Sequence, residues 1–259
     1  MGLFSRSNHV TIYTVKHSVP LVKDESGSSA NNLDHIESTG GISLRKKTEA
    51  VAVSLRKKDM SGVRAQVIVI LDHSYSMQRD YQNGKVQDLV ERFLGFGLAV
   101  DIDGEIPVIA FDSIVHNPVN VNMSNYHDVV ANSIYKSSQM GSTDLTAALR
   151  VVLDEAKKTD TPLFVAVVTD GEPNDRPTAG DLVCDLASYP VFIKFLAVQK
   201  VDFLEKLDDL SNNERLLDNV DTKEYINLNN ISDEQFAIDM VDEWDSWTKA
   251  ALAAGVLTQ

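Results

Sequence analysis

Short apolar runs alternate with amphipathic segments along most of the chain. The most uniform runs cover residues 67–71, 163–168 and 191–198. Runs of this length, rich in β-branched residues, predict buried parallel strands. Over residues 85–100 and 144–158, apolar side chains recur every three or four positions, which predicts helices with one buried face. The alternation predicts an α/β fold, a doubly wound, mostly parallel sheet with helices on both faces.

Weaker patterns extend this prediction. Residues 106–111 predict another strand, and residues 115–121 predict an antiparallel edge strand because they contain Pro118. We also expect a short strand at 225–228 and one long helix over 232–254, which starts with the capping box Ser232-Asp233-Glu234-Gln235. Trp244 and Trp247 are expected to pack from that helix onto the sheet.

The first 62 residues differ in composition from the rest. Residues 24–41 are rich in Ser, Asn and Gly, which predicts a linker or long loop. Two similar basic phrases follow, Ser43-Leu44-Arg45-Lys46-Lys47 and Ser54-Leu55-Arg56-Lys57-Lys58. They predict either a solvated basic face or a contact with an acidic partner, the chain's own acidic part included. We therefore divide the chain into an N-terminal extension (1–62), partly basic with a linker, and a domain (63–259).

Charge and composition exclude several classes of function. The chain carries 24 basic and 38 acidic residues, a net charge of −14. Such a surface repels phosphates and anionic lipid, so we expect neither nucleic acid nor membrane as a partner. The single cysteine, Cys184, excludes an intrachain disulfide and a cysteine-based zinc site. The N-terminal residues lack the apolar region of a secretory signal, so we expect a cytoplasmic protein.

Oxygen-bearing side chains follow three of the expected segments. Asp72, Ser74 and Ser76 come directly after the first apolar run, Thr143 lies in the loop before a helix, and Asp170 follows the second apolar run. In doubly wound sheets, ligands bind at the carboxyl ends of the strands. Hydroxyl and carboxylate oxygens without thiolates suit Mg²⁺, Mn²⁺ or Ca²⁺. The sequence therefore predicts a divalent-cation site built from these five residues.

Each of these residues has a structural alternative when taken singly. Asp72 can simply end a strand, Ser74, Ser76 or Thr143 can cap a helix, and Asp170 before a glycine is a common turn residue. Their joint occurrence at three corresponding places favours the cation site. We interpret the nearby histidines as surface or loop residues rather than ligands; they are His73, His116 and His127.

The motif resembles a known family. Asp72-x-Ser74-x-Ser76, Gly141-Ser142-Thr143-Asp144 and Thr169-Asp170-Gly171, in this order, resemble the metal-ion-dependent adhesion site (MIDAS) of a von Willebrand factor A (vWA) domain, over about residues 64–250. Residues 71–77, 84–91 and 106–111 resemble more specifically the intracellular bacterial TerF-like subgroup, which is associated with tellurium resistance and stress response.

The resemblance implies a Rossmann-like vWA fold and a set of ligand roles. It implies that Ser74, Ser76 and Thr143 ligate the ion directly, while Asp72 and Asp170 act directly or through water and hold the hydroxyls in place. A remaining position would accept an Asp or Glu carboxylate from an unidentified protein partner. His73 and Tyr75 are larger than the residues often found at these positions, and we expect both to line the rim of the site.

Three functions remain open from the sequence. The leading one is a non-enzymatic, Mg²⁺-type cation-dependent protein-binding module of a bacterial stress or tellurium-resistance system. The alternatives are a metal-dependent phosphatase or hydrolase and a protein that senses or sequesters toxic cations. No paired nucleophile and base and no glycine-rich nucleotide loop is evident, so we assign no catalytic residue and no organic cofactor.

Overall fold

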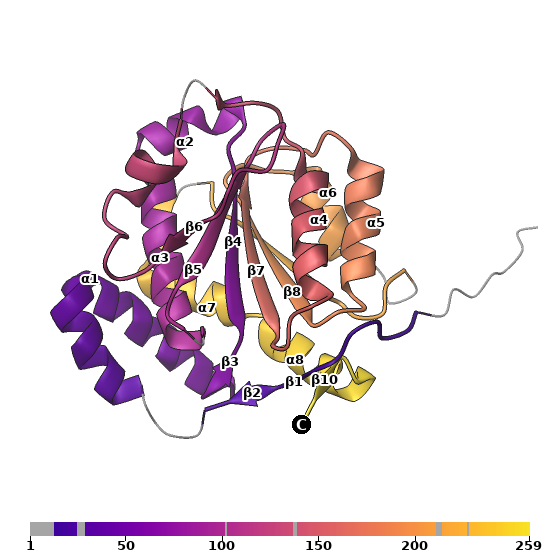
Figure 1. Cartoon of the computed structure of the whole chain (residues 1–259), viewed down its shortest axis with the longest axis horizontal. Helices are drawn as coiled ribbons and strands as arrows, with labels where there is room; N and C mark the ends of the chain where they lie inside the picture. Colours follow the sequence, from indigo (N-terminus) through magenta and orange to yellow (C-terminus); the bar gives the residue numbers. More distant parts are fainter. Residues whose placement is uncertain (1–12, 25–28, 102, 137–138, 211–213, 227) are drawn as a thin grey trace, which may run out of the picture.

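A computed structural model places one six-stranded sheet at the centre of the molecule (Figure 1). It describes residues 13–24, 29–101, 103–136, 139–210, 214–226 and 228–259. The strands lie in the order β6-β5-β4-β7-β8-β9. They are β4 (Gln66–Asp72), β5 (Ile106–Phe111), β6 (Val119–Val121), β7 (Leu163–Thr169), β8 (Val191–Ala197) and β9 (Val220–Glu224). All pairs are parallel except β5–β6, so the predicted mixed sheet with one antiparallel edge strand is confirmed.

Helices cover both faces of this sheet, as the sequence predicts. In Figure 1, α4, α5 and α6 lie on one side of it and α3, α7 and α8 on the other. The helices are α1 (Ser29–Lys57), α2 (Gln78–Gln82), α3 (Lys85–Val100), α4 (Leu145–Ala156), α5 (Arg176–Leu186), α6 (Asp202–Asp208), α7 (Asp233–Val241) and α8 (Trp244–Ala254). Short helical turns lie at η1 (Tyr75–Met77), η2 (Val130–Ile134) and η4 (Leu228–Asn230).

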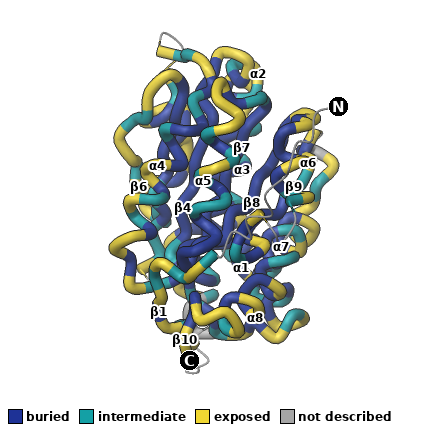
Figure 2. The backbone as a smooth tube through the Cα atoms, turned by 90° about the vertical axis from the view of Figure 1, so that its right-hand side faces the viewer, coloured by how far each residue is buried: buried dark blue, intermediate teal, exposed yellow. Residues whose placement is uncertain are grey.

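The central strand contributes to two hydrophobic cores because successive strand residues point to opposite faces. Val67 and Val69 of β4 belong to the core beneath α3, α7 and α8, whereas Ile68 and Ile70 belong to the core beneath α4, α5 and α6. The inner strands are therefore dark along their length in the burial view (Figure 2). The two tryptophans of α8 pack onto the sheet as expected, Trp244 against Phe164 and Trp247 against Phe192.

The linker prediction for residues 24–41 is wrong where the structure describes a helix. Helix α1 begins at Ser29 and runs through a kink at Gly41, whose φ of 80° suits a glycine. Ile36 and Leu44 of α1 are buried in the first core, and the helix packs against α3 and α7. Burial of these widely spaced apolar residues therefore outweighs the loop-like composition.

The two basic phrases, which lie in α1 and extend one residue past it to Lys58, contact the acidic part of the same chain. Lys47 pairs with Asp233 at 3.6 Å, and Lys58 lies 3.3 Å from both Asp242 and Asp245. Of the two alternatives left by the sequence, the contact within the chain is therefore present at these two lysines. The division at residues 62 and 63 stays a prediction.

The predictions of a strand at 225–228 and of one long helix over 232–254 are wrong, and the buried side chain of Lys194 explains both. The last strand of the sheet is β9 rather than residues 225–228, and it is hidden in the sequence because Asp221 is polar. Asp221 is buried against Lys194 of β8, which also donates to the carbonyl of Asp242 at 2.8 Å. The expected long helix breaks there into α7 and α8, with Glu243 at a φ of 61°.

Two pairs of short strands lie outside the central sheet, and one of them joins the two ends of the described chain. β1 (Val19–Pro20) pairs in parallel with β10 (Leu257–Thr258), and β2 (Val22–Lys23) pairs with β3 (Val63–Arg64). Both pairs lie at the edge of the molecule opposite to the carboxyl ends of β4 and β7 (Figure 1). Among the described residues, no helix is long and apolar enough to cross a membrane.

Helix α1 offers a matched pair of substitutions that tests its part in the fold. Leu44 is 1% exposed, whereas Ile42 is 60% exposed. We expect Leu44→Ala to lower the free energy of unfolding by about 2–5 kcal/mol, because it leaves a cavity against α3. Ile42→Ala should change it by less than about 0.5 kcal/mol. Urea unfolding of both variants is the measurement, and equal effects would contradict the placement of α1.

Candidate metal centre at the carboxyl edge of the sheet

Asp72 lies at the carboxyl end of the central strand β4. Its side chain is fully buried and its two oxygens have different partners. Oδ1 accepts a hydrogen bond from the backbone N–H of Ser74 at 2.8 Å, and Oδ2 accepts one from the hydroxyl of Thr169 at 2.6 Å. Asp72 therefore fixes the start of its own loop and connects it to the end of the neighbouring strand β7.

Two serines connect that loop to Asp170. Ser74 Oγ lies 3.1 Å from Ser76 Oγ, and Ser76 Oγ donates to Asp170 Oδ1 at 2.8 Å. Ser74 occupies the position before η1, but its side chain makes no capping hydrogen bond there. The helix-capping alternative is thus not what holds this hydroxyl. These contacts place the Ser74 and Ser76 hydroxyls beside the carboxylate of Asp170.

The loop that carries Thr143 meets the other two through its backbone. The carbonyl of Gly141 accepts from Tyr75 N at 3.0 Å, and the carbonyl of Thr143 accepts from Asn174 N at 3.0 Å. A Cβ placed on Gly171 would lie 3.5 Å from Thr143 Oγ1, so this hydroxyl faces the loop of Asp170. The residue that caps the N-terminus of α4 is Asp144, whose Oδ1 accepts a hydrogen bond from Ala147 N at 3.0 Å.

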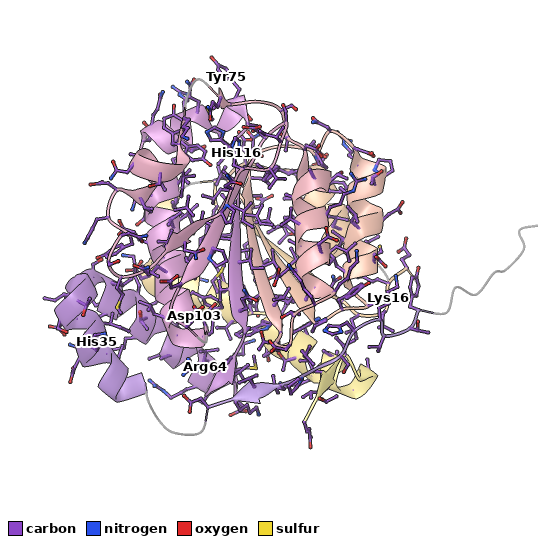
Figure 3. All side chains as sticks on the ribbon, viewed as in Figure 1. Lys16, His35, Arg64, Tyr75, Asp103 and His116 are labelled. Carbon is purple, nitrogen blue, oxygen red and sulfur yellow. The ribbon has the colours of Figure 1, made fainter. Side chains whose placement is uncertain are left out.

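Gly141 is needed for this approach of the loops. A Cβ at this position would lie 2.5 Å from Ser113 Oγ and 3.3 Å from the Cβ of Asp112. Both contacts are closer than real Cβ atoms make without a shift of their neighbours. The absence of a side chain therefore lets the segment before Thr143 pass against the turn after β5. All three predicted segments meet at one edge, the one marked by Tyr75 in Figure 3.

The two carboxylates are costly to ionise in this arrangement. Burial, with a smaller contribution from the negative charge of Asp170, raises the pKa of Asp72 from 3.8 to about 6, in spite of hydrogen bonds from Ser74 and Thr169. Burial also raises the pKa of Asp170, and the charge of Asp80 adds to the effect. A hard divalent ion offsets this repulsion, so the residues present fit Mg²⁺ or Mn²⁺.

The sequence reasoning missed a second layer beneath this site. His73 lies in the loop after β4, as one part of its interpretation has it, but at 2% exposed it is buried and is not a surface residue. Its Nδ1 lies 2.9 Å from Asp112 Oδ2, and His116 Nε2 lies 2.8 Å from the same oxygen. Asp112 directly follows strand β5, and that position at the carboxyl end of a strand was the signal available in the sequence.

The family model described as the vWA domain found in the TerF C terminus matches residues 64–257. The chain belongs to the vWA-TerF-like family. The match begins two residues before β4 and covers the whole sheet, all three loops of the candidate site, and the helices from α2 to α8.

Individual relatives of this vWA domain are distant. The chain is 27% identical over 226 residues to a protein of Bacillus subtilis described as "Uncharacterized protein YcbR", a match that covers 84% of this chain and 90% of the relative. Two solved structures are similar, with TM-scores below 0.5 that support no argument about function. The manganese-loaded TRAP protein of Plasmodium vivax has a TM-score of 0.49 at 15% identity and 70% and 73% coverage. The SpRpn10 VWA domain has a TM-score of 0.45 at 11% identity and 70% and 95% coverage.

Substitution of Asp72 tests the electrostatic cost of the vWA site without an ion. A carboxylate whose pKa rises on folding stabilises the folded state only where it is protonated, so the penalty grows between pH 3.8 and about 6 and is complete above pH 6. The rise corresponds to about 3 kcal/mol at 1.36 kcal/mol per pH unit. In EDTA at neutral pH, we expect Asp72→Asn to be more stable than the unmodified protein by up to this amount.

The advantage of Asp72→Asn should shrink as the pH falls through 6 and vanish near pH 4. Urea unfolding across this pH range is the measurement. Asp154→Asn, which changes an exposed carboxylate of α4, is the matched control and should show no such difference. A variant that is less stable than the unmodified protein at every pH would contradict the assigned cost.

Proposed function

We propose that this vWA domain is a non-enzymatic, cation-dependent protein-binding module of a bacterial stress or tellurium-resistance system. A Mg²⁺-type ion, held by Asp72, Ser74, Ser76, Thr143 and Asp170, would dock a carboxylate of a protein partner. One observation carries this proposal. Two buried carboxylates that repel one another, Asp72 and Asp170, lie beside hydroxyl groups at one edge of the sheet. The family match to the TerF type supports the placement in such a system.

The ligand set explains why a partner carboxylate is the fitting addition. The bound ion supplies a positive charge that neutral hydroxyls from Ser74, Ser76 and Thr143 neutralise only weakly. Asp72 accepts from Ser74 N and Thr169 Oγ1, so this carboxylate positions the serine loop relative to β7. The chain's own groups thereby hold the hydroxyls towards one point, and an ion with neutral hydroxyls as direct ligands would stay electrophilic enough to take an acidic side chain of the partner.

The contacts of the serines favour binding over hydrolysis. A nucleophilic serine needs a base that accepts its proton, most often an imidazole. The hydrogen bonds of the Ser74 and Ser76 hydroxyls run to one another and to Asp170. The neighbouring imidazoles of His73 and His116 point to Asp112 instead. This division of partners supports a docking site in preference to a phosphatase.

Two exposed apolar side chains flank the candidate metal centre. Tyr75 lies between the two serine ligands and is 68% exposed, and Ile114, in the turn after β5, is 61% exposed. The adjoining residue of that turn, Ser113, contacts Ser142 of the Thr143 loop through their hydroxyls at 3.1 Å. Large exposed apolar residues beside a charged centre suit a protein partner better than a small phosphorylated substrate.

Loss of one carboxylate should remove both ion binding and partner capture. We expect Asp170→Asn to weaken Mn²⁺ binding by at least about tenfold, because it removes a charge that holds Ser76 and the ion. Calorimetric titration with Mn²⁺ and then Mg²⁺ measures this. Pull-downs with Mg²⁺ or EDTA should retain a partner only with the unmodified protein in Mg²⁺, and Asp154→Asn serves as the control that keeps both properties.

Partner capture that is the same in EDTA, or in Asp170→Asn, would contradict the docking role. Turnover of a generic phosphate ester that vanishes in Asp170→Asn would favour the hydrolase instead. Binding of several weak ions with no change in Asp170→Asn would favour cation buffering by the acidic surface. One ion per chain is the stoichiometry that the docking role requires.

Substitution of Tyr75, at the rim of the site, tests the partner contact separately from ion binding. We expect Tyr75→Ala to weaken partner binding by about 1–3 kcal/mol, as the loss of an aromatic contact at an interface does, while the affinity for Mn²⁺ stays within about twofold. Titration of the captured partner and of Mn²⁺ gives the two values. Ile238→Ala, an exposed apolar change on α7 far from the edge, should alter neither, and a parallel loss of Mn²⁺ affinity in Tyr75→Ala would show that the ring supports the loop rather than the partner.

A further inference from the structure

Three side chains of metal-binding types, two imidazoles and one carboxylate, meet beside the serine loop. His73 Nδ1 and His116 Nε2 lie 2.9 Å and 2.8 Å from one oxygen of Asp112. One ligand atom from each of the three residues lies within 4.8 Å of the other two. The imidazole rings meet edge to face, with centroids 5.4 Å apart and an interplanar angle of 77°. The two rings therefore approach the carboxylate from different directions.

The backbone fixes these side chains before any ligand arrives. His73 N donates to the carbonyl of Phe111 at 2.6 Å, and His116 N donates to the carbonyl of Ala110 at 2.9 Å. The second oxygen of Asp112 accepts from Ile114 N at 3.1 Å. Two neighbouring parallel strands, β4 and β5, thus carry the three groups at their carboxyl ends. Such rigid support is what a metal site needs, because small displacements of ligands cost affinity.

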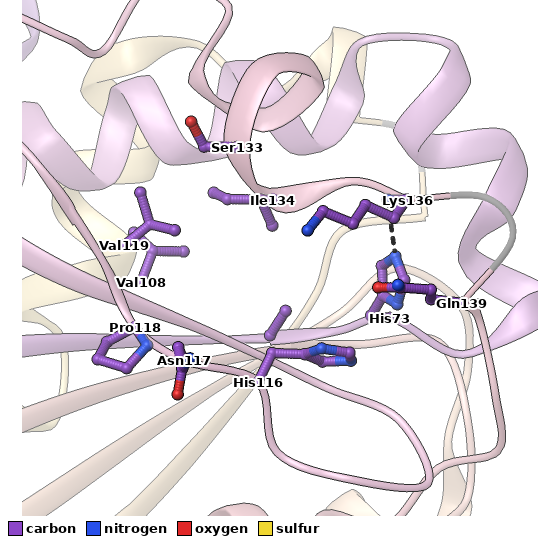
Figure 4. Close-up of a pocket in the computed structure, with 11 residues that line it drawn as sticks. His73, Val108, His116, Asn117, Pro118, Val119, Ser133, Ile134, Lys136 and Gln139 are labelled. Atoms are coloured by element: carbon purple, nitrogen blue, oxygen red, sulfur yellow. Dashed lines mark hydrogen bonds between the residues drawn. The ribbon is translucent and has the colours of Figure 1, made fainter.

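A pocket opens beside the two imidazoles. It has a volume of about 250 Å³, and both His73 and His116 line it. Figure 4 shows the two rings side by side in its wall, near Asn117 and Lys136. The pocket is large enough for several water molecules. Water in this pocket would lie beside the two imidazoles that hold an ion against Asp112.

The donor set differs in kind from that of the candidate MIDAS. Two imidazole nitrogens and one carboxylate oxygen suit first-row transition metals, whereas hydroxyls and carboxylates suit Mg²⁺. Ligands at about 2.1 Å from an ion are about 3.0 Å apart at right angles and about 3.4 Å apart in a tetrahedron. The two N–O separations at Asp112, 2.9 Å and 2.8 Å, are closer to the first value. We propose that His73, Asp112 and His116 form a second metal site, which binds a transition-metal dication such as Zn²⁺, Ni²⁺ or Co²⁺.

The protonation states are compatible with such an ion. An ion would replace the two hydrogen bonds at Asp112 Oδ2, while Oδ1 would keep its hydrogen bond from Ile114 N. Coordination through His73 Nδ1 places the ring proton on Nε2. That nitrogen now accepts from Lys136 N at 3.3 Å, a long and weak bond that ion binding breaks. The amide of Lys136 therefore reports on the site.

Cobalt is the probe that separates the two sites. Co²⁺ is titrated into the full chain with Mg²⁺ in large excess, so that the oxygen-only site is filled with Mg²⁺. We expect one further equivalent of Co²⁺ to bind and to give the visible absorption of a nitrogen-ligated ion. His116→Ala should weaken this binding by more than the roughly 10–100-fold that the loss of an outer partner costs, because His116 is a direct ligand.

Two controls keep the result specific. His127→Ala removes an exposed imidazole elsewhere and should leave Co²⁺ binding unchanged. Asp170→Asn alters the candidate MIDAS and should also leave it unchanged. In the unmodified protein, Co²⁺ should shift the ring resonances of His73 and His116 and the amide resonance of Lys136, but not the ring resonances of His127. This readout needs no substitution, so it stands even where His116→Ala is poorly folded.

Two results would overturn the second site. One is the absence of tight Co²⁺ binding when Mg²⁺ is in excess. The other is Co²⁺ binding that persists in folded His116→Ala or that shifts all histidine resonances alike. Loss of Co²⁺ binding in Asp170→Asn but not in His116→Ala would assign the ion to the oxygen site. Neither result would affect the proposed docking of a partner through Mg²⁺.

Discussion

The arrangement of the carboxyl edge depends on one buried carboxylate. Asp72 ends the central strand, and its two oxygens reach in opposite directions, to the N–H of Ser74 and to the hydroxyl of Thr169. These bonds set the position of the serine loop against β7 and therefore against Asp170. The same burial that makes the bonds strong also makes the charge expensive. A fold that retains such a group gives up stability for a function of the site.

Much of the sheet was predictable because its strands are buried on both faces. The runs that form β4, β7 and β8 contain few polar residues, and the helical spacing of α3 and α4 is regular. Asp221 is a residue that such an apolar pattern cannot place in a strand. Its charge removes β9 from any apolar pattern, yet Lys194 on the next strand makes its burial acceptable. A pairing between strands is invisible in either segment alone.

The candidate site also contains residues that the sequence indicated and residues that it did not. The residues that supply oxygens stand in short motifs after apolar runs, so the sequence alone indicated them and their order. Asp112 and His116 lie together after β5, but their relation to His73 depends on the adjacency of β4 and β5 in the sheet. Helix α1 was missed for a related reason, since its Ser, Asn and Gly content favours a loop until α3 and α7 offer a surface to cover.

The pairing of β1 with β10 places both ends of the described chain at the edge of the molecule away from the candidate site. Residues 19–20 and 257–258 run side by side at the edge away from Tyr75 (Figures 1 and 3). A linker placed experimentally at Gln259 would therefore hold the domain by its base and leave the serine and threonine loops directed into solution. On a surface, or as part of a larger assembly, many copies held in this way would turn the same face outward, so even a weak individual contact would gain strength through multivalency.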